Sequence, residues 1–212
     1  MDLRLVNILN KMNSIVTQIE YDGLFYRQLE DMADSMTNMG CSFEEISNSF
    51  YNEFKRFLED NGYQFYLAYG SNMNLSQMDY RCPDSFVFDK VEIPNYKFVL
   101  DRAGVASIIP SKGHKVEALL WVVHALDVET LDMYEGVRFG CYEKTSMDVK
   151  IDSVTLNVLV YFSLRDLSKA GYRSDYMDGI IKAAEEAKFS KEYIKELKTW
   201  NKDVKMGCYC VK

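Results

Sequence analysis

The spacing of apolar residues changes at Tyr63, and this change limits what the chain can fold into. Before it, apolar side chains recur at intervals of three and four residues, which is typical of one face of an α-helix. After it, short segments rich in β-branched and aromatic residues are separated by Pro, Gly and Asp, which is typical of strands joined by turns. The sequence therefore predicts a helical segment at residues 1–62 and a mixed domain at residues 63–212.

The first 62 residues are predicted to form three short amphipathic helices. Gly23 and Gly40 separate the helices, and Ser42 followed by Glu45 has the spacing of a capping box at the start of the third. Each helix carries a stripe of apolar residues, which we expect to form the core of a small bundle or clasp rather than a groove for a partner. The stripes consist of Leu5, Ile8, Leu9, Met12, Ile15, Val16 and Ile19, then Phe25, Leu29, Met32 and Met36, then Ile46, Phe50, Phe54, Phe57 and Leu58.

The rest of the chain is predicted to be α+β: a small mixed or closed, β-barrel-like sheet with peripheral helices. The expected strands are residues 63–69, 86–91, 95–101, 105–110, 116–123, 142–151 and 154–163. The expected helices are residues 74–80, 127–134, 174–188 and 190–202.

The distribution of charge argues against a nucleic-acid partner. The formal net charge is −7, and residues 1–62 carry most of it, with 5 Lys and Arg against 11 Asp and Glu. The remaining residues are nearly balanced, so no excess of cations is available to neutralise phosphates. No apolar run approaches the roughly 20 residues that span a bilayer, so we expect no membrane partner.

The five cysteines are odd in number and irregularly spaced, and the start of the chain has no export signal. We therefore expect reduced thiols and a cytoplasmic protein. Cys208 and Cys210 form a CxC pair, but the chain has only two histidines, which is weak support for a metal site. We expect no metal and no cofactor.

The segment from Tyr66 to Met73 is the most informative for function. An aromatic, strand-like run ends abruptly in Gly70, Ser71 and Asn72, and a helix is expected to begin at Asn74. A glycine turn at a helix start presents unpaired backbone N–H groups, which can hold a carboxylate or a developing oxyanion. Ser71 is not expected to be a nucleophile, because no base is near it in sequence and the Gly-x-Ser-x-Gly pattern is absent.

A second informative segment surrounds Glu135. This residue ends a predicted helix, Gly136 follows it, and Tyr142 begins a strand. A carboxylate at such a junction can point into a cavity, where desolvation raises its pKa toward the range of a general base. The alternative is an ordinary exposed glutamate at a helix end. Three further carboxylates on the same helix are left out of the site, because charges at a helix start are ordinary capping choices: Asp127, Glu129 and Asp132. Asp132 and Glu135 share a face of the helix, however, and their mutual repulsion could raise the pKa of one of them.

The two segments together resemble the γ-glutamylcyclotransferase-like family. Tyr66–Met73, with Asn74 to Met78 and Arg81-Cys82-Pro83, resembles the family's opening motif, and Glu135-Gly136-Val137 with Gly140 and Tyr142 resembles its second. Two later features also fit the family: a tyrosine at the end of a strand, here Tyr161, and a closing helix, here beginning at Ser174-Asp175-Tyr176. The closing helix departs from the family at its edges, with Arg173-Ser174 in place of the usual Pro-Ser and Ala183-Ala184 in place of the usual Gly-Ala. The resemblance covers about residues 63–189 and leaves out the first 62.

The resemblance implies an enzyme that cyclises a small γ-glutamyl compound to 5-oxoproline without a cofactor. Glu135 then corresponds to the proton-shuttling carboxylate. The residues that correspond to the substrate loop and cavity wall are Tyr66, Leu67, Ala68, Tyr69, Gly70, Ser71, Tyr142 and Tyr161. Two alternatives stay open: a non-catalytic binding or interaction module on this fold, and a deprotecting acyltransferase acting on a γ-glutamyl-capped metabolite. The striped N-terminal helices could pack on their own domain or on a second copy, as a homodimer.

Overall fold

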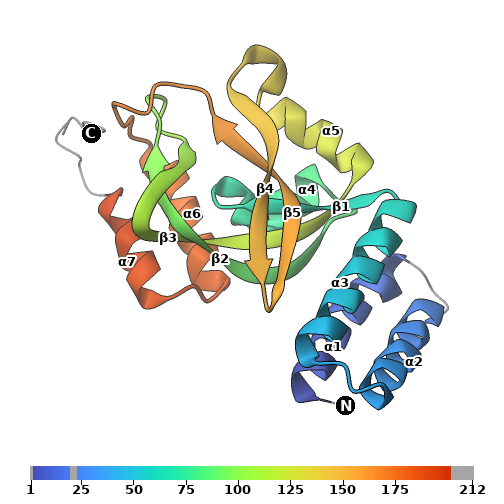
Figure 1. The fold of residues 1–212 in the computed structure, drawn as a ribbon. Coiled ribbons are helices and arrows are strands. Elements are labelled where there is room, and N and C mark those ends of the chain that lie inside the picture. The colour runs from blue at the N-terminus through green and yellow to red at the C-terminus, as the bar shows by residue number, and fades with distance from the viewer. Residues whose placement is uncertain (1, 20–22, 202–212) are drawn as a thin grey trace. The chain divides into compact units, whose positions relative to one another are not determined.

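The computed structural model describes residues 2–19 and 23–201 (Figure 1). This part of the chain divides into two compact units. One consists of residues up to 64 together with 150–156, and the other of residues 65–149 together with 157–201. The first unit therefore includes a short internal segment in addition to the expected helical region.

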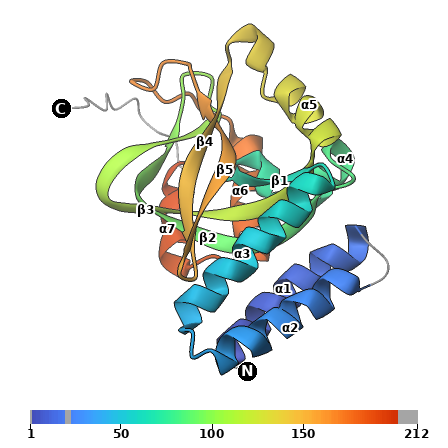
Figure 2. The ribbon, with the colours of Figure 1, turned by 45° about the vertical axis from the view of Figure 1, so that its right-hand side comes forward.

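The first unit contains the three helices predicted from the apolar stripes: α1 (Leu3–Ile19), α2 (Leu24–Asn38) and α3 (Phe43–Asp60). The helices lie side by side (Figure 2). Their shared core is aromatic and aliphatic, with the ring of Phe25 lying 4.5 Å from that of Phe57 and 6.4 Å from that of Phe54. The burial of these stripes supplies most of the stability of such short helices.

The predicted capping box at the start of α3 is confirmed. The backbone N–H of Glu45 donates to Ser42 Oγ at 3.3 Å, and the backbone N–H of Ser42 donates to Glu45 Oε2 at 2.7 Å. Two backbone donors that the helix start leaves without partners are thereby satisfied.

The second unit is built on one mixed sheet in the strand order β2-β3-β1-β5-β4. Its strands are β1 (Tyr63–Ala68), β2 (Phe86–Leu100), β3 (Ala106–His124), β4 (Tyr142–Ile151) and β5 (Val154–Ser163). β1 runs parallel to β5, with Tyr66 opposite Leu159, whereas β2 and β3 are antiparallel. The predicted α+β class is confirmed, and of the two sheet forms expected, the described sheet is the open, mixed one.

Two pairs of expected strands are each a single long strand. Residues 86–91 and 95–101 form β2, and residues 105–110 and 116–123 form β3. The interruption expected at Pro94 is absorbed by an irregularity between Pro94 and Tyr96, where Asn95 adopts a φ of 61°. Proline is compatible with a strand at such a bulge, so the ladder continues past it.

Helices and short 3₁₀ turns complete the second unit: η1 (Ser71–Met73), α4 (Leu75–Arg81), α5 (Ala125–Tyr134), η2 (Val137–Phe139), α6 (Ser174–Glu186) and α7 (Lys191–Thr199). α5 begins two residues before its expected start because the His124 side chain accepts from the backbone N–H of Leu126 at 3.3 Å. No helix of residues 2–19 and 23–201 is long and apolar enough to cross a membrane.

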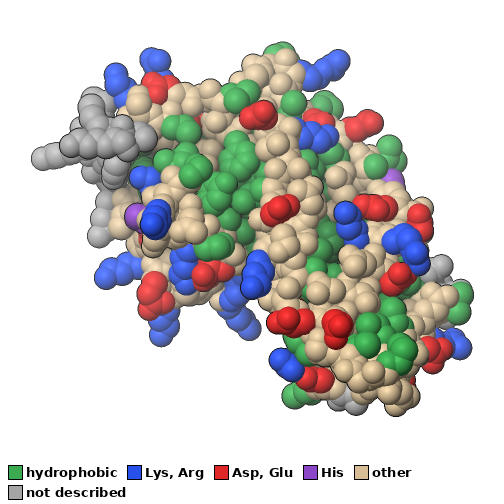
Figure 3. All heavy atoms as spheres, viewed as in Figure 1, with side chains coloured by type: hydrophobic (Ala, Val, Ile, Leu, Met, Phe, Trp, Pro, Cys, Tyr) green, Lys and Arg blue, Asp and Glu red, His purple; other side chains and the backbone are tan. Residues whose placement is uncertain are grey.

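Positive and negative side chains are interspersed on the face shown in Figure 3. This face therefore presents no large surface of a single sign.

Candidate active site

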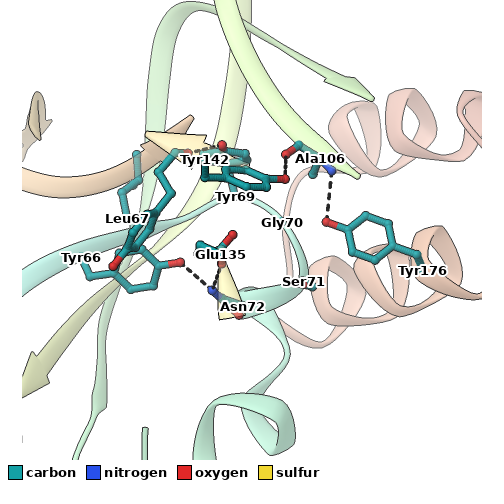
Figure 4. A pocket seen from close by; sticks show the side chains of 11 residues that line it. Tyr66, Leu67, Tyr69, Gly70, Ser71, Asn72, Ala106, Glu135, Tyr142 and Tyr176 are labelled. Carbon is teal, nitrogen blue, oxygen red and sulfur yellow. Dashed lines mark hydrogen bonds between the residues drawn. The ribbon is translucent and has the colours of Figure 1, made fainter. Parts of the chain in front are cut away.

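A small cavity opens in the second unit, where the turn after β1 approaches the end of α5 (Figure 4). The hollow encloses about 300 Å³ of space between atoms, part of which is open to solvent. The lining residues are Tyr66, Leu67, Tyr69, Gly70, Ser71, Asn72, Ala106, Glu135, Tyr142, Tyr161 and Tyr176. The structure brings together every site residue named from the sequence except Ala68, which is buried in β1 and does not line the cavity. Their roles in catalysis stay a prediction.

Gly70 lies at the junction of β1 and η1, where another chain segment passes very close. A Cβ atom added at Gly70 would lie 3.1 Å from the Cβ of Ala106 and 3.5 Å from Tyr176 Oη. A side chain there would push on the cavity wall, so glycine permits the close approach. Neither Gly70 nor Asn72 donates its backbone N–H to another residue of the described chain. These donors are available to an anionic or oxyanionic group.

Glu135 is the C-cap residue of α5 and directly follows its last residue, Tyr134. The chain reverses direction immediately after it, because Gly136 adopts a left-handed φ of 64°. The carboxylate points toward the cavity, where Glu135 Oε1 accepts from Asn72 Nδ2 at 2.9 Å. Among the residues that line the cavity, Glu135 is the only carboxylate.

Burial raises the pKa of Glu135 above the ordinary glutamate value of 4.5. The hydrogen bond from Asn72 and the positive charges of Arg81 and Arg165 oppose this rise, but desolvation outweighs them. A raised pKa brings a carboxylate closer to the range in which it exchanges protons efficiently near neutral pH.

Asn72 connects the two halves of the site. Its Nδ2 donates to Glu135 and also to Tyr66 Oη at 2.8 Å. Its Oδ1 accepts from Arg81 Nη1 at 2.6 Å and from Gln77 Nε2 at 3.2 Å. Every hydrogen-bonding atom of the side-chain amide is therefore engaged, which fixes its orientation.

The aromatic wall is held by hydrogen bonds to the backbone. Tyr69 Oη donates to the carbonyl of Tyr161, and Tyr142 Oη donates to the carbonyl of Ala106 at 2.6 Å. The backbone N–H of Ala106 in turn donates to Tyr176 Oη at 3.1 Å. Burial raises the pKa of Tyr69 and of Tyr142, so both stay protonated at neutral pH.

Tyr161 is held by a carboxylate that the sequence analysis had left out of the site. Tyr161 Oη donates to Asp132 Oδ1 at 2.6 Å, and Lys144 Nζ donates to Asp132 Oδ2 at 2.8 Å. Asp132 lies three residues before Glu135 on α5, so one helix carries both the cavity carboxylate and the residue that orients a cavity tyrosine. Asp132 itself does not line the cavity, so it contributes to the site only through its hydrogen bond with Tyr161.

Asp101 is fully buried behind the tyrosine wall of the cavity, and both of its carboxylate oxygens accept hydrogen bonds. Its Oδ2 accepts from Ser163 Oγ at 2.6 Å, and its Oδ1 accepts from the backbone N–H groups of Ala103 and Val105 at 2.8 and 3.2 Å. A buried carboxylate with several donors can order the loop that supplies them. Here that loop leads directly into Ala106, which contacts two of the cavity tyrosines.

The histidines of the described chain lie away from the cavity. His114 Nδ1 is 3.0 Å from Ser111 Oγ, and His124 caps α5, so neither histidine faces the cavity. No group of three or more His, Cys, Asp or Glu side chains in residues 2–19 and 23–201 is arranged to hold a metal. Cys208 and Cys210 lie outside the described residues.

Four residues of this arrangement were absent from the predicted site: Asn72, Ala106, Asp132 and Tyr176. Asn72 directly follows Ser71 in the opening motif, and Tyr176 belongs to the tail segment, so the motifs contained a signal for both. No local pattern marks Ala106 or Asp132, because each acts through a residue that is distant in sequence.

The structure thus defines an α+β domain with a carboxylate beside a tyrosine-lined cavity, and the chain is similar to several known proteins. A model of the AIG2-like family matches residues 115–197, a range that contains Glu135, Tyr142 and Tyr161 but not the Gly70 turn. Gamma-glutamylcyclotransferase of Bos taurus is 22% identical over 172 residues, which cover 76% of this chain and 85% of the relative. The Homo sapiens protein of the same name is 24% identical over 143 residues, covering 63% of this chain and 76% of the relative.

A solved structure of a gamma-glutamyl cyclotransferase matches with a TM-score of 0.60 at 23% identity, covering 65% of this chain and 88% of that one. At this identity the match shows a shared fold. The sequence and fold comparisons confirm the predicted resemblance to the γ-glutamylcyclotransferase-like family, and they support a function of that general type.

Proposed function

We propose that this protein cyclises a small γ-glutamyl amide, amine or dipeptide to 5-oxoproline and releases the amine. In this reaction the α-amine of the substrate attacks its own γ-carbonyl carbon, a five-membered lactam forms, and the original amide bond breaks. The nucleophile belongs to the substrate, so the protein has to supply geometry and proton transfer rather than a nucleophile of its own.

Glu135 carries the proposal. It is a partly buried carboxylate with a raised pKa, it faces the cavity, and the hydrogen bond from Asn72 fixes its direction. We assign to it the removal of a proton from the substrate α-ammonium group and the return of that proton to the leaving amine. One residue suffices for both transfers because the two nitrogens are bonded to the same carbon in the tetrahedral intermediate.

The turn at Gly70 and the tyrosine wall would bind the γ-glutamyl part of the substrate. Backbone N–H groups of the turn suit the substrate carboxylate or the carbonyl oxygen as it gains charge. Tyr142 and Tyr161 would enclose the carbon chain and exclude water from the reacting centre.

We place the reaction in the cytoplasm. Cys41, Cys82 and Cys141 are free thiols, as expected in a reducing compartment.

The test is product formation by the purified full-length chain. A panel of γ-glutamyl amino acids, γ-glutamyl amines and γ-glutamyl-capped peptides would be incubated with the protein, and 5-oxoproline would be measured by mass spectrometry. We expect 5-oxoproline from at least one compound and none above background with Glu135→Gln. Saturable binding of a panel compound without any product would instead support a binding module, and full turnover by Glu135→Gln would refute the assigned base.

A further inference from the structure

The hydroxyl of Tyr66 has an unused proton. Tyr66 is 3% exposed, it lines the cavity, and its Oη accepts a hydrogen bond from Asn72 Nδ2 at 2.8 Å. No acceptor for its own proton is found among residues 2–19 and 23–201. Buried hydroxyl donors generally find a partner, so this unused donor points to a ligand group.

The direction of this hydroxyl follows from Arg81. A guanidinium group has only donors, so the Asn72 atom 2.6 Å from Arg81 Nη1 must be the amide oxygen. The amide nitrogen of Asn72 then faces Tyr66 and Glu135. Because that nitrogen can only donate, Tyr66 Oη must accept from it, and the Tyr66 proton must point away from Asn72.

Three of the other four cavity tyrosines differ in this respect, whereas Tyr176, like Tyr66, has no acceptor for its proton among the described residues. Tyr69, Tyr142 and Tyr161 each donate their proton to an oxygen of the protein. Tyr176 Oη accepts from the backbone of Ala106 and lies beside Ser71. Tyr66, by contrast, shares a single donor nitrogen with Glu135, so its hydroxyl lies next to the carboxylate to which we assign the proton transfers.

We infer that Tyr66 is a catalytic residue that donates a hydrogen bond to the γ-carbonyl oxygen of the substrate, with Arg81 as a positioning residue that acts through Asn72. This inference rests on the proposed function and assigns a side-chain donor to the oxyanion, in addition to the backbone turn at Gly70.

The accounting of the step is simple. The substrate amine nitrogen, after losing its proton to Glu135, forms a bond to the γ-carbonyl carbon, and the carbonyl π electrons move to the oxygen. Tyr66 stabilises that oxygen through its O–H without giving up the proton, since burial raises the pKa of Tyr66 far above neutral pH. When the carbonyl re-forms, the bond to the leaving nitrogen breaks and that nitrogen takes the proton back from Glu135. The freed carboxylate then accepts the second proton of the attacking nitrogen, which leaves a neutral lactam, and passes it to the released amine, which departs as an ammonium ion.

Tyr66→Phe is the first test, because it removes the O–H and keeps the ring that packs edge-on against Tyr161 at 5.8 Å. Loss of one oxyanion donor lowers kcat by about 10²–10³-fold in comparable sites, and we expect a fall of that order with little change in KM. The matched control is Tyr193→Phe, which removes another buried hydroxyl, outside the cavity and without a partner in the described chain. We expect that control to keep the kcat of the unchanged protein.

Replacement of Tyr66 by fluorinated tyrosines measures how kcat depends on the acidity of the phenol, which a change in packing alone would not affect. Fluorine makes the phenol a stronger hydrogen-bond donor at nearly constant size, so kcat should rise with phenol acidity as long as the phenol stays protonated. A kcat that is independent of phenol acidity would contradict a donor role.

The positioning role is tested by Arg81→Met and Arg81→Lys. Lysine also has only donors, so Arg81→Lys should retain more activity than Arg81→Met, in which the Asn72 amide oxygen loses its shortest hydrogen bond and is held by Gln77 alone. In the Tyr66→Phe background, Arg81→Met should lower kcat by a smaller factor than it does alone. If the reduction in kcat in the double variant equals the product of the two single reductions, Arg81 does not act through Tyr66.

The inference and the proposed function fail in different ways. If the unchanged protein forms no 5-oxoproline from any compound of the panel, the proposed function is wrong and the inference falls with it. If the unchanged protein is active and a folded Tyr66→Phe variant keeps its kcat, only the role of Tyr66 is overturned. Circular dichroism and the thermal midpoint of each variant establish that it is folded.

Discussion

The two units of the chain differ in what they bury. The helices α1, α2 and α3 enclose a core that is almost entirely apolar, whereas every buried charged side chain of the described residues lies in the second unit: Asp101, Glu117 and Asp127. The second unit also holds the desolvated Glu135 and the buried amide of Asn72. Burial of polar groups lowers stability unless each is well paired, so such groups accumulate where chemistry or an ordered loop requires them. Packing shapes the first unit, and hydrogen-bond geometry shapes the site in the second.

Glu135→Gln should separate the two units most clearly, because it changes the site in the second unit and leaves the core of the first intact. If Glu135 is the general base, kcat should fall by about 10²–10⁴-fold, the usual contribution of such a group. At neutral pH the free energy of unfolding should rise, because the substitution removes a desolvated charge and keeps an acceptor for Asn72. Steady-state kinetics and urea unfolding measure the two effects, and a loss of both activity and stability would mean that Glu135 is mainly structural.

A core substitution in the first unit should show the opposite behaviour. Phe54 is fully buried, and Phe54→Ala should lower the free energy of unfolding by about 3–5 kcal/mol, through lost burial and the cavity left behind. Urea unfolding followed by circular dichroism gives this value. The kcat of the folded protein should not change, and a fall in kcat under conditions where the helices stay folded would show that the first unit takes part in catalysis.

The pH dependence sharpens the comparison further. Because the pKa of Glu135 is raised, kcat/KM should fall by about tenfold per pH unit as the pH drops below that value, which lies above 4.5. Stability has the other sign: the contribution of Glu135 is fully present below its unfolded pKa and is lost as the pH rises through its folded pKa. Kinetics and urea unfolding across the same pH series measure both.

Glu135→Gln is the control for that series, since its stability should lack the Glu135 contribution at every pH. If kcat/KM instead falls around the ordinary glutamate pKa of 4.5, the base is exposed to solvent, and its assignment to the cavity is contradicted.

The smallest effect is expected at the start of α3. Ser42→Ala removes the acceptor for the backbone N–H of Glu45 and should cost about 1 kcal/mol of unfolding free energy. Ser49→Ala is the matched control, because the Ser49 hydroxyl only bonds back to the carbonyl of Glu45 within the helix. Equal destabilisation by the two substitutions in urea unfolding would show that the cap contributes nothing specific.

Much of the architecture could be predicted from local patterns. The stripes of α1 and α3, the capping box at Ser42 and the helix that ends at Glu135 depend on residues close together in the sequence, so their spacing is sufficient evidence. The continuity of β2 past Pro94 was not predictable in this way. A bulge that accommodates proline depends on the opposite strand, and β3 is not adjacent to Pro94 in sequence.

The sequence by itself determined which segments are helices or strands, and it marked Gly70 and Glu135 as candidates through their motifs. The tertiary structure alone decided that these residues meet across one cavity, that Arg81 orients Asn72, and that Asp132 holds Tyr161. The physical reason is the separation along the sequence of the residues that interact. Hydrophobic periodicity is set by neighbours a few residues away, whereas a hydrogen bond between Asn72 and Glu135 exists only once the sheet and helices have packed.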